Sequence, residues 1–176
     1  MRPGGIERIE TERMVAERLL PGHAAELTAL MGDPRVARTL SPDGGPANEA
    51  QVREIVARQA GAWERDGFGM WLLLGKPDGR MLGRGGLQHT SATGVDEVEV
   101  GWAFLPEHWG HGLATELAHA SIAVAFEDLG IDNVIAFTLV TNAASRRVME
   151  KAGLEYERDF EHVSLPHVLY RRRRAW

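Results

Sequence analysis

Alternating apolar and polar residues mark a strand near the middle of the chain that leads directly into a helix. Residues Glu97 to Phe104 alternate in the manner of a half-buried strand, and Pro106 ends the alternation. Glycines follow at positions 110 and 112, and an Ala- and Leu-rich stretch then predicts a helix over 112–129. The sequence therefore predicts a strand, a glycine turn and a helix in direct succession.

Hydrophobic periodicity predicts further elements before this unit, and residues 1–6 are expected to form a loose leader. The motif Gly32-Asp33-Pro34 is a helix stop signal. The motif Lys76-Pro77-Asp78-Gly79 is a turn signal between two apolar runs, so these runs are expected to pair as an antiparallel hairpin. The expected elements are strands at 11–20, 70–75 and 81–89 and helices at 23–31 and 48–66.

The C-terminal part of the chain predicts a central strand, a capped helix and two closing strands. The run 134–140 is apolar on both faces, as a fully buried strand is. Asn142 stands where it can cap the next helix, which is expected to end at Gly153. Strands are expected at 154–161 and 167–173. Because no repeat or low-complexity tract interrupts the pattern, residues 1–176 are expected to form a single α+β domain.

Composition narrows the chemistry that is open to the chain. Its 176 residues are 44% hydrophobic and 26% charged, as in ordinary globular proteins. The absence of cysteine excludes disulfides, thiolate metal sites and acyl transfer through a cysteine nucleophile. The pair His108 and His111 has no third ligand at a convincing spacing, so no metal is expected.

Charge and hydropathy set the expected surroundings of the protein. A net charge of −5 disfavours a general nucleic-acid-binding surface, so no direct contact with nucleic acid is expected. No stretch approaches the ~18 apolar residues that a membrane span needs, and no apolar leader is present. A cytoplasmic location without membrane contact is therefore expected.

The glycine turn is a candidate phosphate site. A strand that enters a helix through such a turn presents unpaired backbone N–H groups beside the positive end of the helix dipole. The Rossmann fingerprint is excluded because Thr115 stands where its third glycine is needed, and the P-loop is excluded because no Gly-Lys-Ser/Thr follows. Tight turns also take glycine for steric reasons alone, so the turn by itself leaves both interpretations open.

Longer motifs give a more specific signal. The run Trp109–Glu116 (W-G-H-G-L-A-T-E) resembles the acetyl-CoA pyrophosphate loop of the GNAT acetyltransferases, whose pattern is Arg/Gln-x-x-Gly-x-Gly/Ala. Gly112 and Ala114 match this pattern, while Trp109 replaces Arg or Gln, as is common in the RimJ/RimL-like branch. The run Thr141–Leu154 resembles a second segment of that branch, and the opening T-E-R-M-V-A-E-R-L-L-P-G-H a third. The resemblance covers nearly the whole chain.

The resemblance implies a fold and a reaction. The GNAT fold is a twisted, mixed, mostly antiparallel sheet of about six to seven strands with about four helices. The implied reaction moves the acetyl group of acetyl-CoA to a primary amine by direct attack, without a metal or a covalent enzyme intermediate. The acceptor is a protein N-terminus or a small-molecule amine, and Leu40–Pro46 is a candidate specificity loop. A homodimer is possible, and a non-catalytic acyl-CoA-binding or sensing protein is the alternative.

The resemblance also assigns residues to the cofactor. Backbone N–H groups at the end of the strand would meet the pantetheine arm and the oxyanion, and those of the glycine turn would meet the pyrophosphate. Asn142 and Ser145 would meet the arm near the thiol. The residues expected to bind the cofactor are Ala103, Phe104, Leu105, Trp109, Gly110, His111, Gly112, Leu113, Ala114, Thr115, Asn142 and Ser145.

Glu99 is the candidate general base. Strand alternation places it on a face that it shares with Glu97, Gly101 and Ala103, where small residues leave room for a ligand. In related enzymes a glutamate at this strand position takes the proton from the amine, often through water. A solvated edge carboxylate is the alternative interpretation, and Glu97 is a second candidate base.

Ser145 is the candidate partner of the departing thiolate. Many GNAT enzymes place a tyrosine in the later helix as the acid, but Met149 stands there and cannot donate a proton. The RimJ/RimL-like branch offers Ser145 instead. The alternative is that Ser145 only supports the helix start that Asn142 caps.

Overall fold

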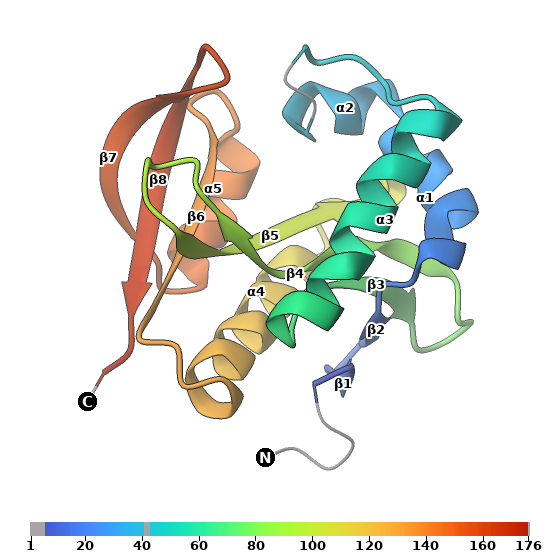
Figure 1. Ribbon diagram of the computed structural model, residues 1–176, viewed down its shortest axis with the longest axis horizontal. Coiled ribbons are helices and arrows are strands. Elements are labelled where there is room, and N and C mark those ends of the chain that lie inside the picture. Colours follow the sequence, from blue (N-terminus) through green and yellow to red (C-terminus); the bar gives the residue numbers. More distant parts are fainter. Residues whose placement is uncertain (1–5, 41–42, 176) are drawn as a thin grey trace.

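The computed structural model describes residues 6–40 and 43–175. In this part of the chain, eight strands form one sheet in the order β1-β2-β3-β4-β5-β6-β8-β7 (Figure 1). The strands are β1 (Arg8–Glu10), β2 (Met14–Arg18), β3 (Met70–Gly75), β4 (Met81–Thr90), β5 (Glu97–Phe104), β6 (Asn133–Leu139), β7 (Glu155–His162) and β8 (Leu165–Arg173). Neighbouring strands run antiparallel except β5 and β6, which run parallel.

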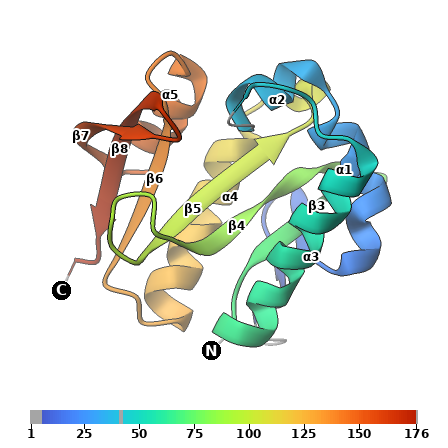
Figure 2. The same cartoon turned by 45° about the horizontal axis from the view of Figure 1, so that its top comes forward.

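Helices cover both faces of the sheet. The helices are α1 (Ala24–Met31), α2 (Pro34–Leu40), α3 (Glu49–Asp66), α4 (Leu113–Ala123) and α5 (Ala143–Lys151), with short turns η1 (Pro21–His23), η2 (Pro106–His108) and η3 (Val124–Asp128). Figure 2 shows α1 and α3 on one side of the central strands and α4 on the other. None of the helices in the described ranges is long and apolar enough to cross a membrane.

The core divides into two clusters because the sheet separates the helices. On one side, α4 and α5 pack Leu117, Ile122 and Met149 against the sheet. On the other, α1 and α3 pack Leu27 and Val52 toward the sheet. The alternation predicted for β5 follows this division, since Val100 and Phe104 belong to the first cluster and Ala103 to the second.

The parallel pair β5–β6 shapes the site. Its register consists of one residue pair, Glu99 with Ile135, and beyond it the two strands diverge (Figure 2). Backbone groups of β5 past this point therefore have no neighbouring strand on the β6 side. A cavity opens at this divergence.

The mixed, mostly antiparallel α+β sheet predicted from the sequence is confirmed, with three differences in its elements. The described sheet has eight strands rather than six to seven, because the predicted strand 11–20 contains β2 and a further short strand, β1, precedes it and pairs with it. The motif Gly32-Asp33-Pro34 ends α1 as predicted, but Pro34 also begins α2. The missing N–H of proline suits the first helical position, and Asp33 Oδ1 accepts a hydrogen bond from Arg35 N at 2.8 Å. Residues 1–5 of the expected leader lie outside the described residues, but Ile6 is fixed, because its carbonyl accepts a bond from Trp71 Nε1 at 2.9 Å.

Side-chain caps begin two of the helices. Asn48 Oδ1 accepts a bond from Gln51 N and Gln51 Oε1 accepts one from Asn48 N, both at 2.9 Å, which is a complete capping box for α3. Asn142 caps α5 as predicted.

Candidate active site

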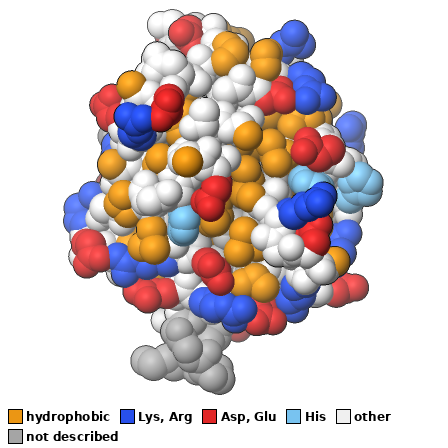
Figure 3. Space-filling view, turned by 90° about the vertical axis from the view of Figure 1, so that its right-hand side faces the viewer, with side chains coloured by type: hydrophobic (Ala, Val, Ile, Leu, Met, Phe, Trp, Pro, Cys, Tyr) orange, Lys and Arg blue, Asp and Glu red, His pale blue; other side chains and the backbone are white. Residues whose placement is uncertain are grey.

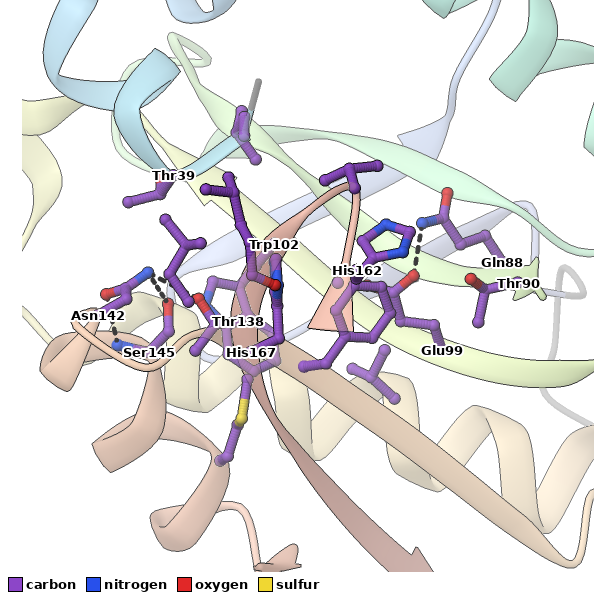
Figure 4. A pocket seen from close by; sticks show the side chains of 18 of the residues that line it. Thr39, Gln88, Thr90, Glu99, Trp102, Thr138, Asn142, Ser145, His162 and His167 are labelled. Atoms are coloured by element: carbon purple, nitrogen blue, oxygen red, sulfur yellow. Dashed lines mark hydrogen bonds between the residues drawn. The ribbon is translucent and has the colours of Figure 1, made fainter. Parts of the chain in front are cut away.

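A cavity of about 320 Å³ lies where β5 and β6 diverge (Figure 4). Strands β4, β5 and β6, helix α5 and the β7–β8 hairpin line it, and Thr39 and Leu40 reach it from the end of α2. Leu40 is thus the described part of the predicted specificity loop that meets the cavity, while residues 41 and 42 of that loop lie outside the described residues. The polar residues of the lining are Thr39, Arg84, Gln88, Thr90, Glu99, Thr138, Asn142, Ser145, His162 and His167.

Glu99 lies at one end of this cavity in Figure 4, next to Gln88. The register of β4 and β5 sets the two residues opposite each other, and Gln88 Nε2 donates to Glu99 Oε2 at 2.8 Å. Gly101 leaves space beside the carboxylate, since a Cβ on this glycine would lie 3.7 Å from Glu99 Oε1. Among the described lining residues, Glu99 carries the single carboxylate.

The surroundings of Glu99 adjust its proton affinity. Burial raises the pKa of the carboxyl to about 7, although the hydrogen bond from Gln88 and the charge of Arg84 both lower it. A carboxyl with such a pKa exchanges protons near neutral pH, which is what a general base requires.

Glu97, the second candidate base, lies in a different environment. Its carboxylate accepts bonds from Arg171 Nη1 at 2.5 Å and from Thr93 Oγ1 at 2.6 Å. Neither Glu97 nor these two partners is among the residues that line the cavity. The structure therefore gives Glu97 a place in an ion pair between strands.

Ser145 and Asn142 form the other end of the cavity in Figure 4. Asn142 Oδ1 accepts a bond from Ser145 N at 3.2 Å, and Asn142 Nδ2 donates to Ser145 Oγ at 3.1 Å and to Thr138 Oγ1 at 2.9 Å. Because the serine oxygen accepts the bond from Asn142, its own proton is free to be donated into the cavity. Met149 lines the cavity and is buried.

The backbone at the end of β5 corrects part of the predicted cofactor contact. Leu105 N donates to Leu82 O at 2.9 Å, so this N–H is not available to a ligand. Backbone direction alternates along a strand, which turns the N–H of Ala103 toward β4 as well and those of Trp102 and Phe104 toward the gap beside β6. Of the three predicted residues, only Phe104 has a backbone N–H that faces the gap, and the N–H of Trp102 faces it too.

The glycine turn presents a cluster of free donors at the start of α4. Gly110 and Gly112 have positive φ angles of 78° and 80°, which glycine adopts without strain. Glu116 N donates to Gly112 O as the first bond of the helix. Among the described residues, no acceptor is found for the backbone N–H groups of residues 110–115. These residues do not line the cavity and lie beyond the end of β5.

Two side-chain contacts at this turn were not predicted. Trp109, which replaces Arg or Gln of the family pattern, donates from Nε1 to Phe104 O at 2.8 Å. Arg13, from the start of β2, donates from Nη1 to His111 O and from Nε to Glu116 Oε2, both at 2.7 Å. No local pattern signals the second contact, because Arg13 lies about a hundred residues away in the sequence.

Sequence reasoning also missed several cavity residues, among them Arg84, Gln88, His162 and His167. For Gln88 a signal was available, because an antiparallel pairing of the predicted strands 81–89 and 97–104 sets it opposite Glu99. The histidines come from the distant β7–β8 hairpin and carry no such signal. No group of three or more His, Asp or Glu side chains able to hold a metal ion occurs within residues 6–40 and 43–175.

Comparison with known proteins connects this geometry to a family. Residues 13–155 match the model described as an acetyltransferase (GNAT) domain. The uncharacterized protein YkkB of Bacillus subtilis is 29% identical over 144 residues, which are 82% of either chain. The FsC-acetyl coenzyme A-N(2)-transacetylase of Aspergillus fumigatus is 36% identical over 100 residues, covering 53% of this chain and 42% of that protein.

Solved structures agree. A putative GnaT-family acetyltransferase from Bordetella pertussis superposes with a TM-score of 0.81 at 25% identity, covering 94% of this chain and 98% of that one. RimL, a ribosomal-protein alpha-N-acetyltransferase solved with coenzyme A, superposes with a TM-score of 0.79 at 15% identity, covering 95% of this chain and 98% of that one. AAC(6')-Ib, solved with ribostamycin and coenzyme A, superposes with a TM-score of 0.76 at 16% identity, covering 93% of this chain and 94% of that one. The last two likenesses concern the fold alone. Since the family model covers most of the sequence, the chain belongs to the GNAT acetyltransferases.

Proposed function

We propose that this protein transfers the acetyl group of acetyl-CoA to a primary amine, with Glu99 as the general base. The observation that carries the proposal is Glu99 itself, a half-buried carboxyl with a pKa of about 7 at the divergence of β5 and β6. A base works best when its pKa lies near the working pH, because it is then ionised and still able to hold a proton. Membership of the acetyltransferase family supports the reaction class.

Three features of the chain fit the parts of acetyl-CoA, which would be a substrate. The unpaired N–H groups of residues 110–115, at the positive end of the α4 dipole, suit a pyrophosphate. The gap beside β5, with the N–H groups of Trp102 and Phe104, suits the amide-bearing pantetheine arm and the thioester oxygen. Ser145 and Asn142 at the end of the cavity suit the sulfur.

The proposed reaction is a direct attack of the amine on the thioester. Glu99 takes a proton from the ammonium group, and the freed nitrogen lone pair attacks the thioester carbonyl carbon. The C–N bond forms, negative charge moves to the carbonyl oxygen, and backbone N–H groups of β5 stabilise it. The carbonyl re-forms as the C–S bond breaks, and the thiolate leaves with a hydrogen bond from the Ser145 hydroxyl. The attacking nitrogen gives up its second proton as the amide forms, and the thiolate takes up that proton to leave as the CoA thiol.

The side chain of Trp109 bears on the RimJ/RimL-like assignment, which is part of this proposal. Its indole is engaged with the Phe104 carbonyl, so the backbone of the turn would hold the pyrophosphate without the side-chain contact that Arg or Gln supplies elsewhere. The named acceptors of structural neighbours include a ribosomal protein N-terminus and aminoglycosides. The acceptor here is proposed as a primary amine of either kind, and the cytoplasmic location and homodimer stay predictions.

One observation favours a second candidate, a non-catalytic acyl-CoA sensor. Met149 occupies the position where many family members carry a tyrosine acid, and this side chain lines the cavity without a proton to donate. A sensor would bind acetyl-CoA without releasing CoA when amines are added.

Release of the CoA thiol from acetyl-CoA tests both candidates. A panel of small amines, amino acids and N-terminal peptides is offered to the wild type, to Glu99→Gln and to Glu155→Gln, which changes an exposed glutamate on the edge strand β7. We expect amine-dependent release that falls by at least about 100-fold at neutral pH in Glu99→Gln and is unchanged in the control. Full activity in Glu99→Gln would remove Glu99 from the reaction. Tight acetyl-CoA binding without release on the whole panel would favour the sensor.

A further inference from the structure

A second cavity, of about 510 Å³, adjoins the first. The two share Leu40, Arg84, Gln88 and His162, and the second continues toward helix α3, where Arg58, Gln59 and Arg65 line it. Cavities of this combined size accommodate a small molecule rather than a single water or ion. An acceptor whose amine lies at Glu99 would therefore extend toward Arg84 and α3.

The charged side chains of this second cavity are all of one sign. Its described lining contains Arg58, Arg65 and Arg84 and no Asp or Glu. The Arg65 guanidinium pairs with Asp66, which lies outside the lining. The chain as a whole has a net charge of −5, and the surface on the side of α1 and α3 mixes acidic and basic side chains (Figure 3). The cationic lining is thus a local feature that the overall composition does not produce.

Arg84 is the most unusual of these residues. Its Nε atom is buried and has no hydrogen-bond partner in the described structure. The charge of Glu99 acts on Arg84, but burial outweighs it and lowers the pKa of the guanidinium. Arg18 and Arg171, whose side chains are 23% and 13% exposed, each bind two glutamates, although Arg18 Nε also lacks a hydrogen-bond partner. A covered charge without a partner is costly, so a group that binds Arg84 would offset that cost.

Gln59 shows the same lack of a partner at the α3 wall. Its Oε1 atom is buried and accepts no hydrogen bond in the described structure. Arg58, the neighbouring residue on α3, is exposed at the cavity rim, and its charge acts on Arg84. Unpaired polar groups therefore occur on both walls of the cavity, β4 and α3.

The strand register sets Arg84 on the same side of the sheet as the proposed base. Arg84 pairs with Ala103 and Gln88 pairs with Glu99, which sets Arg84 and Glu99 on one face of the sheet. Ala103 is small and leaves the guanidinium free above the strand. The charge of Arg84 reaches Glu99, where it lowers the pKa of the carboxyl.

We propose that the acceptor is an amine that also carries a carboxylate, which binds Arg84 with support from Arg58 while the amine lies at Glu99. The planar guanidinium matches a carboxylate with two parallel hydrogen bonds. This proposal deepens the proposed acetyl transfer and rests on it for the place of the amine. It selects amino acids and compounds like them over polyamines and other purely cationic amines, which the arginines would repel.

Matched acceptor pairs test the proposal. Each L-amino acid and its carboxamide differ by one charge at nearly constant shape, so the ratio of their kcat/KM values, at a pH where both amines are equally free, measures recognition of the carboxylate. We expect wild type to prefer the acid of at least one pair by about 30- to 100-fold, Arg84→Gln to lose this preference mainly through KM, and Arg84→Lys to keep part of it. Arg53→Gln, an exposed change on α3 outside the cavity, should leave the ratio unaltered.

A binding measurement separates this proposal from the reaction itself. Calorimetric titration of the same amino acids and amides, without acetyl-CoA, reports the carboxylate site even if no transfer occurs. Binding that depends on both the carboxylate and Arg84, with no thiol release, would uphold the site and overturn the proposed activity. Transfer to neutral amines with equal losses for acid and amide in Arg84→Gln would overturn the carboxylate site and leave the activity standing. An aminophosphonate preferred over the matching amino acid would also overturn it, in favour of a phosphate-like group.

Discussion

Two neighbouring regions of β5 differ in whether their charged side chains have charged partners. Around Glu97, the guanidinium of Arg171 binds Glu97, Asn133 and Glu157, so every charge has a partner. Around Glu99, the single bond comes from the neutral amide of Gln88. The two glutamates are two residues apart and lie on the same face of one strand, yet the first is held in an ion-pair network and the second faces a cavity.

The pKa values in the two regions shift in opposite directions. Pairing raises the pKa of Arg171 and lowers that of Glu157, so both groups are held in their charged forms. Burial without pairing moves Glu99 and Arg84 the other way, to pKa values of about 7 and about 10. Partners rather than position in the strand therefore decide whether a buried charge stabilises the fold or is left for chemistry and ligands.

The largest expected effect comes from breaking the paired region. Arg171→Leu leaves Glu97 and Glu157 without their common partner, and we expect it to lower the free energy of unfolding by about 2–4 kcal/mol. Urea unfolding at pH 7 measures this loss. Arg173→Leu is the matched control, because Arg173 is 74% exposed and lies 3.9 Å from Glu157, and it should change stability by less than about 0.5 kcal/mol. Equal small losses in both variants would contradict a structural role for the network.

In the unpaired region, replacing the charged residue Glu99 should stabilise the protein rather than destabilise it. Burial raises the pKa of Glu99 above its ordinary 4.5 to about 7, so between these values the folded protein binds more protons than the unfolded chain. Stability contributed by the protonated carboxyl is therefore lost as pH rises through this window. Glu99→Gln has no carboxyl to ionise, so its free energy of unfolding should exceed that of wild type by at most about 3 kcal/mol at pH 8 and by little at pH 4.5. Urea unfolding at both pH values measures the difference, and parallel pH dependence in the two proteins would contradict the raised pKa.

The sequence predicts these two regions unequally. Alternation along β5 and the cap at Asn142 depend on residues close in the chain, and both were predicted. The strand β1 was not predicted, because so short a strand leaves little periodicity. The helix α2 was not predicted either, because Pro34 acts as both a stop and a start. The partners that separate Glu97 from Glu99 come from β4 and β8, and the divergence of β5 from β6 is a property of the assembled sheet. Local patterns carry no information about either.

A smaller effect is expected at Ser145, where the comparison extends to the far end of the cavity. Ser145→Ala removes the hydroxyl but keeps the backbone N–H that Asn142 caps, so the helix start is preserved. We expect kcat to fall by about tenfold with the midpoint of thermal unfolding within a degree or two of wild type, because the departing thiolate loses one hydrogen bond. Steady-state kinetics and calorimetry measure the two quantities. An unchanged kcat would reduce Ser145 to a residue of the helix start.

The smallest effect concerns Arg13, a paired charge that supports a group of unpaired donors. Its guanidinium binds the His111 carbonyl and the Glu116 carboxylate, which fixes the turn whose N–H groups we assign to the pyrophosphate. Its side chain is 45% exposed, so water replaces much of what Arg13→Gln removes. We expect KM for acetyl-CoA to rise by about three- to fivefold and kcat to stay constant, since the acceptor end of the cavity is untouched. A fall in kcat at unchanged KM would place Arg13 in the chemical step instead, and the distinction between charges that shape the fold and charges that serve the reaction would then not hold at this turn.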